Sequence, residues 1–150
     1  MIAGIDIGGT QVRVAAARSD GRIVATKRAR TGSLGGPAGL IEWACEALEG
    51  LRDGERLRVV SISAPGPLDS RRGMLGNPPN LPGWHNLPLA DRLSQLLSCP
   101  VYLENDAAIQ EVSGVGEVEA YAGIFRRIRA AALDPPATTA HLKQLATTLE

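Results

Sequence analysis

The sequence has 150 residues, of which 44% are hydrophobic and 21% are charged, and this length and composition are typical of one soluble globular domain. Sixteen basic residues balance sixteen acidic ones, which argues against nucleic acid and against a membrane surface as partners. No stretch approaches the ~20 apolar residues of a membrane helix. Because the first residues also lack the basic segment of a secretion signal, we expect a cytoplasmic protein.

Three strands are predicted at the start of the chain. Residues 1–7 are short and β-branched and end at two glycines, and apolar residues then alternate along residues 12–15 in the period-2 pattern of a half-exposed strand. A turn at residues 19–22 precedes a third strand over residues 23–30. We therefore predict an antiparallel meander whose first turn, Gly8-Gly9-Thr10, is a strand–strand hairpin.

Helices and strands alternate in the next part of the chain. Apolar residues recur at helical spacing over residues 40–51 and 87–97, and residues 57–63 and 101–104 are predicted as short apolar strands. Strands joined through helices are usually parallel, so these elements complete a mixed five-stranded sheet covered by helices. The predicted fold class is α/β, with further helices after residue 107.

Residues 65–88 contain most of the prolines and are predicted as a long ordered loop or a short hairpin. The rigid turns around Gly66 and Asn80 offer side-chain amides and open backbone groups, which are the groups that bind polyols. The prolines are explained equally well if they only make this loop rigid. Trp84 is interpreted as a packing anchor, and His85 as a surface residue.

The segment from Asp6 to Thr10 carries the clearest local signal for chemistry. Two glycines after a strand let backbone N–H groups come close to an anion. Asp6 could hold a hydrated Mg²⁺ ion, and Thr10 could donate its hydroxyl to a phosphate oxygen. The segment is neither a P-loop nor a dinucleotide fingerprint, because no Gly-Lys-Ser/Thr and no helix follow. A tight hairpin turn without a ligand is the alternative.

A second polar cluster, Glu104-Asn105-Asp106, follows the last predicted strand. Open α/β sheets bind their ligands at the carboxyl ends of strands. There Asp106 could accept a proton from a sugar hydroxyl, and Asn105 could hydrogen-bond a neighbouring hydroxyl. The alternative is that Asn105 or Asp106 caps the helix that follows.

The cysteines indicate no metal site. Cys45 and Cys99 stand far apart, and neither belongs to a C-x-x-C pair. His85 and His141 add no ligand spacing. We expect both thiols to be reduced, and we expect no structural zinc.

The order of these motifs resembles the ROK family of bacterial sugar kinases and sugar-responsive repressors. The matching pieces, in order along residues 1–110, are IDIGGT, SISAPGPLD, GNPPNLPGW and LENDA. Four motifs in the right order make the resemblance highly specific. It implies the actin-like ATPase, ribonuclease H-like fold, with ATP and Mg²⁺ as cofactors and a hexose as substrate.

The resemblance also implies roles for individual residues. The residues at the ATP phosphates would be Asp6, Gly8, Gly9 and Thr10, and Asp6 would hold the metal through water. Asp106 would be the catalytic base that takes the proton of a hexose hydroxyl, of glucose or an N-acetyl amino sugar, as it attacks the γ-phosphoryl group. The sugar ligands would be Gly66, Asn80, Asn105 and Asp106.

The sequence departs from the family after residue 110. The family continues with a second lobe that carries a second phosphate loop, a Glu-x-Gly-His motif and a cysteine-rich zinc site, and none of the three occurs in these residues. We expect an actin-like lobe over residues 1–110 and a helical segment over residues 111–150 that is similar in part to a helix of the second lobe. Poor or absent turnover by the isolated chain is expected. The alternative function is a non-catalytic sugar-binding lobe or the remnant of a sugar-responsive repressor, and a homo-oligomer is compatible with either.

Overall fold

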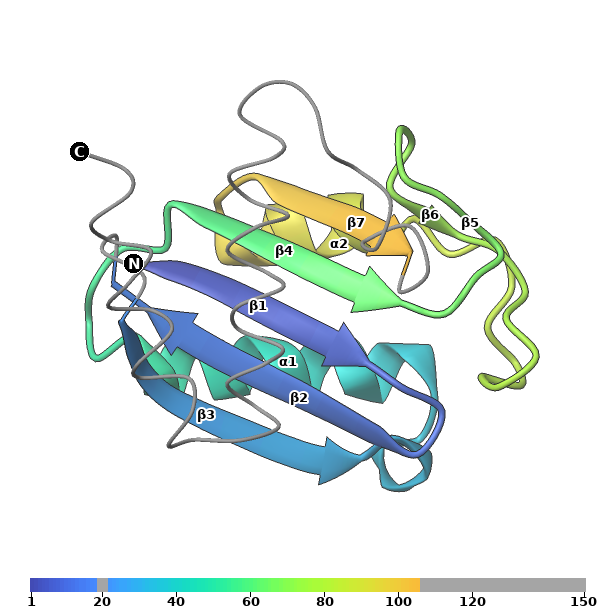
Figure 1. The fold of residues 1–150 in the computed structure, drawn as a ribbon, viewed down its shortest axis with the longest axis horizontal. Helices are drawn as coiled ribbons and strands as arrows, with labels where there is room; N and C mark the ends of the chain where they lie inside the picture. Colours follow the sequence, from blue (N-terminus) through green and yellow to red (C-terminus); the bar gives the residue numbers. More distant parts are fainter. Residues whose placement is uncertain (19–21, 106–150) are drawn as a thin grey trace.

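The computed structural model of the protein describes residues 1–18 and 22–105. Its centre is a five-stranded sheet with the strand order β3-β2-β1-β4-β7 (Figure 1). The strands are β1 (Ile2–Ile7), β2 (Gln11–Ala17), β3 (Ile23–Arg30), β4 (Val59–Ala64) and β7 (Val101–Asn105). The first three form the predicted antiparallel meander, and β4 and β7 run parallel to β1. The predicted mixed α/β sheet is confirmed.

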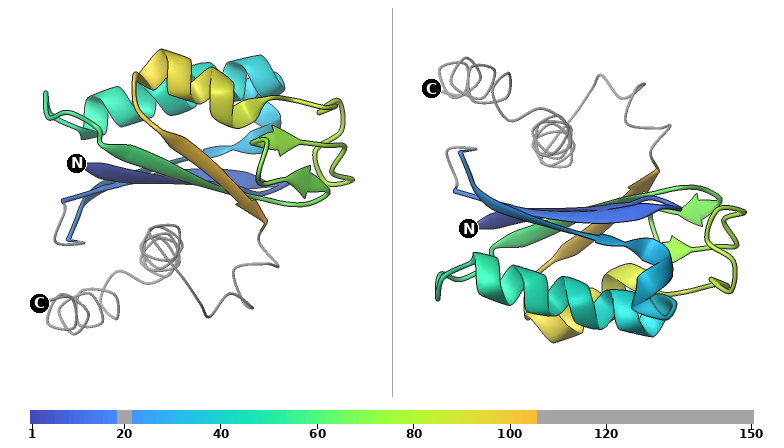
Figure 2. Two further views of the ribbon diagram at one scale, coloured as in Figure 1. Left: turned by 90° about the horizontal axis from the view of Figure 1, so that it is seen from above. Right: turned by 90° about the horizontal axis from the view of Figure 1, so that it is seen from below.

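In the described residues, α1 (Pro37–Leu51) and α2 (Leu89–Leu97) cover the same face of the sheet (Figure 2). Pro37 has the fixed φ that suits a first helical turn, and it follows Gly36, whose φ of 92° favours glycine. The buried residues of α1 recur at helical spacing, at Leu40, Ile41, Ala44, Ala47, Leu48 and Leu51. Helix α2 begins two residues later than predicted, because Leu87 pairs with Leu75 as a β-bridge.

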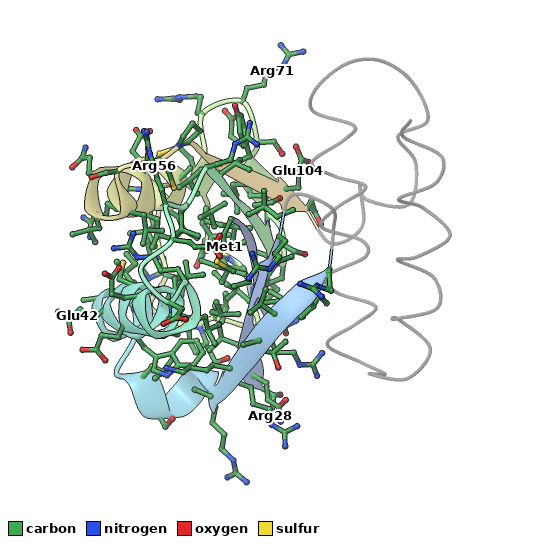
Figure 3. All side chains as sticks on the ribbon, turned by 90° about the vertical axis from the view of Figure 1, so that its left-hand side faces the viewer. Met1, Arg28, Glu42, Arg56, Arg71 and Glu104 are labelled. Atoms are coloured by element: carbon green, nitrogen blue, oxygen red, sulfur yellow. The ribbon has the colours of Figure 1, made fainter. Side chains whose placement is uncertain are left out.

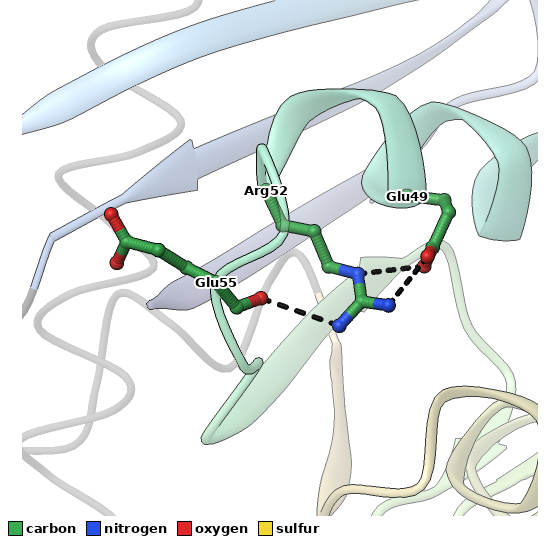
Figure 4. A network of polar contacts seen from close by, with 3 residues as sticks. All are labelled: Glu49, Arg52 and Glu55. Atoms are coloured by element: carbon green, nitrogen blue, oxygen red, sulfur yellow. Dashed lines mark hydrogen bonds and ion pairs between the residues drawn. The ribbon is translucent and has the colours of Figure 1, made fainter.

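An exposed polar network follows the end of α1 (Figure 4). Arg52 donates from Nε and Nη2 to the two carboxylate oxygens of Glu49, and from Nη1 to the backbone oxygen of Glu55 at 3.3 Å. The hydrogen bond from Arg52 lowers the pKa of the Glu49 carboxyl below its ordinary value. Because this ion pair is exposed to water, it contributes little to the stability of the fold. Its role is to hold the shape of the turn after α1.

The core lies between the sheet and the two helices. Alternate strand residues point toward the helices, as the period of a strand requires, and the largest of them are fully buried, among them Ile5, Ile7, Ile62 and Leu103. Burying an aliphatic side chain of this size contributes roughly 1.5–3 kcal/mol. The opposite face carries a small apolar cluster of Ile2, Ala17 and Val59 at one end. Toward the carboxyl ends of β1 and β4 the same face becomes polar.

Residues 65–88 contain both of the predicted alternatives, a short hairpin and a loop. Strands β5 (Leu68–Asp69) and β6 (Met74–Leu75) form a two-stranded antiparallel hairpin beside the carboxyl ends of β4 and β7 (Figure 1). The loop that follows is anchored by the buried side chain of Trp84, which confirms its interpretation as a packing residue, and His85 is exposed.

Within the described part of the chain, no helix combines the length and the apolar character needed to cross a membrane. The helices predicted after residue 107 and the domain boundary predicted at residue 110 lie outside the described residues. Both stay predictions from the sequence.

The turn between β1 and β2 is the predicted strand–strand hairpin. Thr31, the buried first residue of the 3-10 helix η1 (Thr31–Leu34), fastens this turn to the end of β3. Its hydroxyl donates a hydrogen bond to the carbonyl oxygen of Gly8 at 2.7 Å, and its N–H donates to the carbonyl oxygen of Thr10 at 3.0 Å. Both carbonyl groups that flank Gly9 are therefore held against the protein.

Replacing Thr31 by valine, which keeps the shape of the side chain and removes the hydroxyl, should destabilise the fold. The carbonyl of Gly8 then loses its partner in a part-buried position, so we expect the free energy of unfolding to fall by about 1–2 kcal/mol. Urea denaturation measures this change. Thr26→Val, at an exposed position of β3, is the control and should stay within about 0.5 kcal/mol of the unaltered chain. Equal losses in the two variants would contradict the prediction.

Candidate functional site

The described site residues predicted from the sequence gather at one edge of the sheet. Strands β1, β4 and β7 are parallel and adjacent, so their carboxyl ends lie side by side. Ligands of open α/β sheets bind at this edge. The glycine turn follows β1, the loop that contains Gly66 and Asn80 follows β4, and Asn105 ends β7.

The glycine turn offers the N–H groups of Gly9 and Thr10 to a ligand. The N–H of Gly8 donates to the carbonyl oxygen of Gln11 at 2.9 Å, so it is used inside the hairpin. Gly9 and Thr10 are exposed, and Thr31 keeps the flanking carbonyl oxygens on the protein side. These two N–H groups and the Thr10 hydroxyl are the donors that an oxyanion can reach.

Asn80 lies directly against the glycine turn. A Cβ atom at position 9 would stand 2.8 Å from the backbone oxygen of Asn80 and 3.0 Å from its Cβ atom. The first distance is shorter than real Cβ contacts, so only glycine lets the loop approach the turn this closely. The structure thus brings together a residue predicted at the phosphates and a residue predicted at the sugar.

Gly66 and Asn105 make a second close approach. A Cβ atom on Gly66 would stand 2.6 Å from Nδ2 of Asn105, so the amide group of Asn105 packs over this glycine. The register of β4 and β7 pairs Ala64 with Asn105, which brings the loop after β4 past this side chain. Two residues predicted to bind the sugar are therefore neighbours.

Asp6 faces an arginine of the neighbouring strand. Strands β1 and β2 pair Asp6 with Arg13, and Nη1 of Arg13 lies 3.8 Å from Oδ2 of Asp6. Both side chains are partly exposed, at 22% for Asp6 and 28% for Arg13. In phosphoryl-transfer sites Mg²⁺ is usually held by one or two carboxylates together with water and substrate phosphates. A single partly exposed carboxylate beside an anion-binding turn fits this donor set.

Two further polar side chains extend the pair of Arg13 and Asp6 into a row across the sheet. The register places Ser63 of β4 beside Asp6, and Glu104 of β7 beside Ser63. Oε2 of Glu104 accepts a hydrogen bond from Oγ of Ser70 at 3.2 Å, which ties the turn between β5 and β6 to the sheet. Through Ser63 and Glu104, the row therefore connects Asp6 of β1 with the segment that follows β4.

Asp106, the predicted catalytic base, follows Asn105 directly and lies outside the described residues. The structure describes Asn105 as the last residue of β7, at the same edge as the glycine turn. The role of Asp106 stays a prediction.

Sequence reasoning missed Thr31 and Arg13. Thr31 gives no local signal, because its contacts depend on where β3 ends relative to a turn far away in the chain. Arg13 could have been found, since a two-residue turn at residues 9–10 fixes the register of the hairpin. Counting back along both strands then places Arg13 opposite Asp6.

The cysteines lie apart from this edge. Burial raises the pKa of the Cys45 and Cys99 thiols above their ordinary value, so both stay protonated near neutral pH. In residues 1–18 and 22–105, no group of three or more His, Cys, Asp or Glu side chains could hold a metal ion.

Known proteins resemble this chain in both sequence and structure. A family model described as the ROK family matches residues 2–118. The glucokinase of Thermotoga maritima is 36% identical over 104 residues, which cover 69% of this chain and 33% of that protein. The crystal structure of a ROK family glucokinase from Streptomyces griseus, in complex with glucose and AMPPNP, matches with a TM-score of 0.63 at 32% identity, over 72% of this chain and 34% of that one.

A ROK family transcriptional regulator, a homolog of the E. coli MLC protein, shares the fold with a TM-score of 0.61 at 16% identity, over 72% of this chain and 28% of that one. The chain spans about a third of the length of the curated glucokinases it matches. The family model nevertheless covers most of the chain, including every site residue predicted above. On this match, and with the actin-like α/β fold of its solved relatives, the chain belongs to the ROK family.

Proposed function

We propose that this chain carries the phosphate- and sugar-binding lobe of an ATP-dependent sugar kinase. The reaction transfers the γ-phosphoryl group of ATP to a hydroxyl of a hexose, either glucose or an N-acetyl amino sugar. The observation that carries the proposal is the contact between Gly9 and Asn80. Phosphoryl transfer needs the attacking hydroxyl next to the γ-phosphate, so groups that bind the two substrates must be neighbours.

The donor side of the site is the glycine turn with Asp6. The N–H groups of Gly9 and Thr10 bind phosphate oxygens, and the fixed direction of these donors costs no reorganisation during the reaction. Asp6 holds Mg²⁺ through water, and the metal when bound supplies positive charge to the phosphates. Arg13, whose Nη1 lies 3.8 Å from Oδ2 of Asp6, orients the carboxylate of Asp6 on the sheet face opposite α1 and α2.

The sugar side of the site is formed by the loop after β4 and by the end of β7. The amides of Asn80 and Asn105 hydrogen-bond sugar hydroxyls, and Gly66 leaves the space that Asn105 occupies. Asp106 accepts the proton of the attacking hydroxyl. The glucokinases that resemble the chain support a hexose as the acceptor.

The residue range of this lobe and the cellular compartment of the protein are part of the proposal. We place it over residues 1–110, within the segment that the family model matches. We place the protein in the cytoplasm, because the proposed reaction uses ATP. The remaining contacts to the nucleoside and to the sugar come from residues outside this lobe, because the chain spans about a third of the glucokinases it matches.

The 150 residues alone should phosphorylate glucose and N-acetyl sugars very slowly or not at all. Closure over both substrates needs groups beyond this lobe, and a misplacement of about 1 Å can cost ~100-fold in rate. A coupled ADP-release assay with several hexoses, run beside Asp106→Asn, measures the turnover. Turnover of roughly 1–100 per second that disappears in Asp106→Asn would refute this expectation and support the kinase proposal. Sugar binding by a chain that neither turns over nor binds AMPPNP would favour a non-catalytic sugar-binding lobe.

Alanine at position 80 or 105 should weaken sugar binding selectively. Each change removes an amide that donates and accepts hydrogen bonds, so we expect a loss of about tenfold in affinity for the preferred hexose. Calorimetric titration of the chain with each sugar measures it. Asn77→Ala is the matched control, because Asn77 is an exposed asparagine of the same loop. If Asn77→Ala weakens binding as much as the other two changes, the sugar does not bind at this edge.

Gly9→Ala should weaken the binding of both substrates. The new Cβ atom would lie 2.8 Å from the backbone oxygen of Asn80, so the turn or the loop must move. We expect the affinities for AMPPNP and for glucose each to fall by about tenfold or more. Gly32→Ala is the control, since a Cβ atom there meets nothing within 4 Å. A loss confined to one ligand would show that turn and loop act independently.

A further inference from the structure

The second face of the sheet, opposite α1 and α2, contains a buried strip that crosses β2, β1 and β4. Figure 3 shows the two sides of the sheet, with Glu42 of α1 on one side and Glu104 of β7 on the other. Two rows of paired residues form the strip, and none of their side chains is more than 7% exposed. The first row is Ile2, Ala17 and Val59, and the second row is Gly4, Ala15 and Ser61.

The described helices do not account for this burial, because α1 and α2 both pack on the first face (Figure 2). A sheet face that nothing covers stays in contact with water. The strip is also narrow, since Thr26 beside Ala15 is exposed and Tyr102 beside Ser61 is 43% exposed. Its three strands span about 10 Å, which is the diameter of one helix.

The segment that covers the strip lies outside residues 1–18 and 22–105. Residues 19–21 are Ser, Asp and Gly, which offer no apolar side chain. Residues 107–112 are too short, because they extend about 9 Å as a helix before the glycines at 114 and 116 interrupt the pattern. Val59 lies about 16 Å back along β4 from Ala64, the partner of Asn105. The cover therefore comes from residues 117–150.

We propose that residues 117–132 form a helix that docks along this strip of the second face. Its apolar side chains recur at helical spacing and extend over about 10 Å of helix axis; they are Tyr121, Ile124, Phe125 and Ile128. Gly4 and Ala15 carry almost no side chain, so large side chains are needed there to reach the close packing of a protein interior. The two aromatic rings of this segment supply them.

The other helix predicted in this part of the chain fits the strip less well. In residues 138–149 the apolar positions are Leu142, Leu145 and Leu149, which form a narrow line along a helix. Covering a face three strands wide takes the wider stripe of residues at i, i+3, i+4 and i+7. Residues 121–128 have this pattern, and the three arginines at 126, 127 and 129 lie off it, where they stay in water.

The proposed contact belongs to a part of the chain that the family match does not cover, because that match ends at residue 118. It uses no group of the candidate site, so it is independent of the proposed function. Its consequence is that the apolar row of Ile2, Ala17 and Val59 is removed from water within the 150 residues alone. The lobe then needs no second lobe to complete its core.

A thiol placed in the strip reports whether the strip is covered. Ser61→Cys keeps the size of the side chain, and Thr26→Cys places a thiol at an exposed position of the same row. Both are labelled with iodoacetamide in the 150-residue chain, and the labelled peptides are identified by mass spectrometry. Cys99 is buried on the first face, so its labelling in the same samples reports global unfolding.

The test variant is Phe125→Asp combined with Ile128→Asp, and the matched control is Leu142→Asp combined with Leu145→Asp. In the otherwise unaltered chain we expect Ser61→Cys to be labelled about tenfold or more slowly than Thr26→Cys. The Phe125/Ile128 variant should abolish this protection while Cys99 stays protected. The Leu142/Leu145 control should change the labelling rate by less than about twofold.

Fast labelling of Ser61→Cys in the unaltered chain, protection that survives the Phe125/Ile128 change, or an equal loss of protection in the control would each overturn the proposal. Where the double variant also exposes Cys99, the milder Phe125→Ala takes its place. Faster labelling of Ser61→Cys with Cys99 still protected then supports the docked helix, and any other result overturns it.

Discussion

The register of the β1–β2 hairpin determines where the polar side chains of these two strands lie at the edge of the sheet that carries the candidate site. The hydrogen bond from Gly8 to Gln11 closes a two-residue turn, and the pairing that follows sets Asp6 opposite Arg13. A shift by one residue would move Asp6 to the face beneath the helices. An unpaired carboxylate in that core would cost several kcal/mol, so the apolar core and the polar edge enforce the same register.

Most of the sheet could be predicted because each strand carries its own local signal, such as the glycine pair after β1 or the alternation in β2. The starts of β4 and α2 each differ from the predictions by two residues, at Val59 and Leu89. In the second case the reason is the bridge between Leu75 and Leu87, which depends on a hairpin that local propensity could not define.

The candidate site was predictable as a set of residues but not as a set of contacts. The motifs indicated Gly9 and Asn80 separately, and only the folded loop shows that one packs on the other. The role of Thr31 could not be predicted for the same reason, because both of its hydrogen bonds join η1 to a turn two strands earlier. Motifs report which chemical groups are present, whereas their distances depend on how loops pack on the core.

The distribution of charge and amide groups around the glycine turn fits a lobe with two ligands. Arginines lie on the β2–β3 side of the turn, and the amides of Asn80 and Asn105 lie on the side of β4 and β7. A lobe that binds only a neutral sugar needs the amides but gains nothing from exposed N–H groups at Gly9 and Thr10. It gains nothing either from Thr31, which holds the carbonyl oxygens of that turn away from the exposed side. Because the exposed turn and the hydrogen bonds of Thr31 are both present in the described residues, they support the proposed kinase lobe.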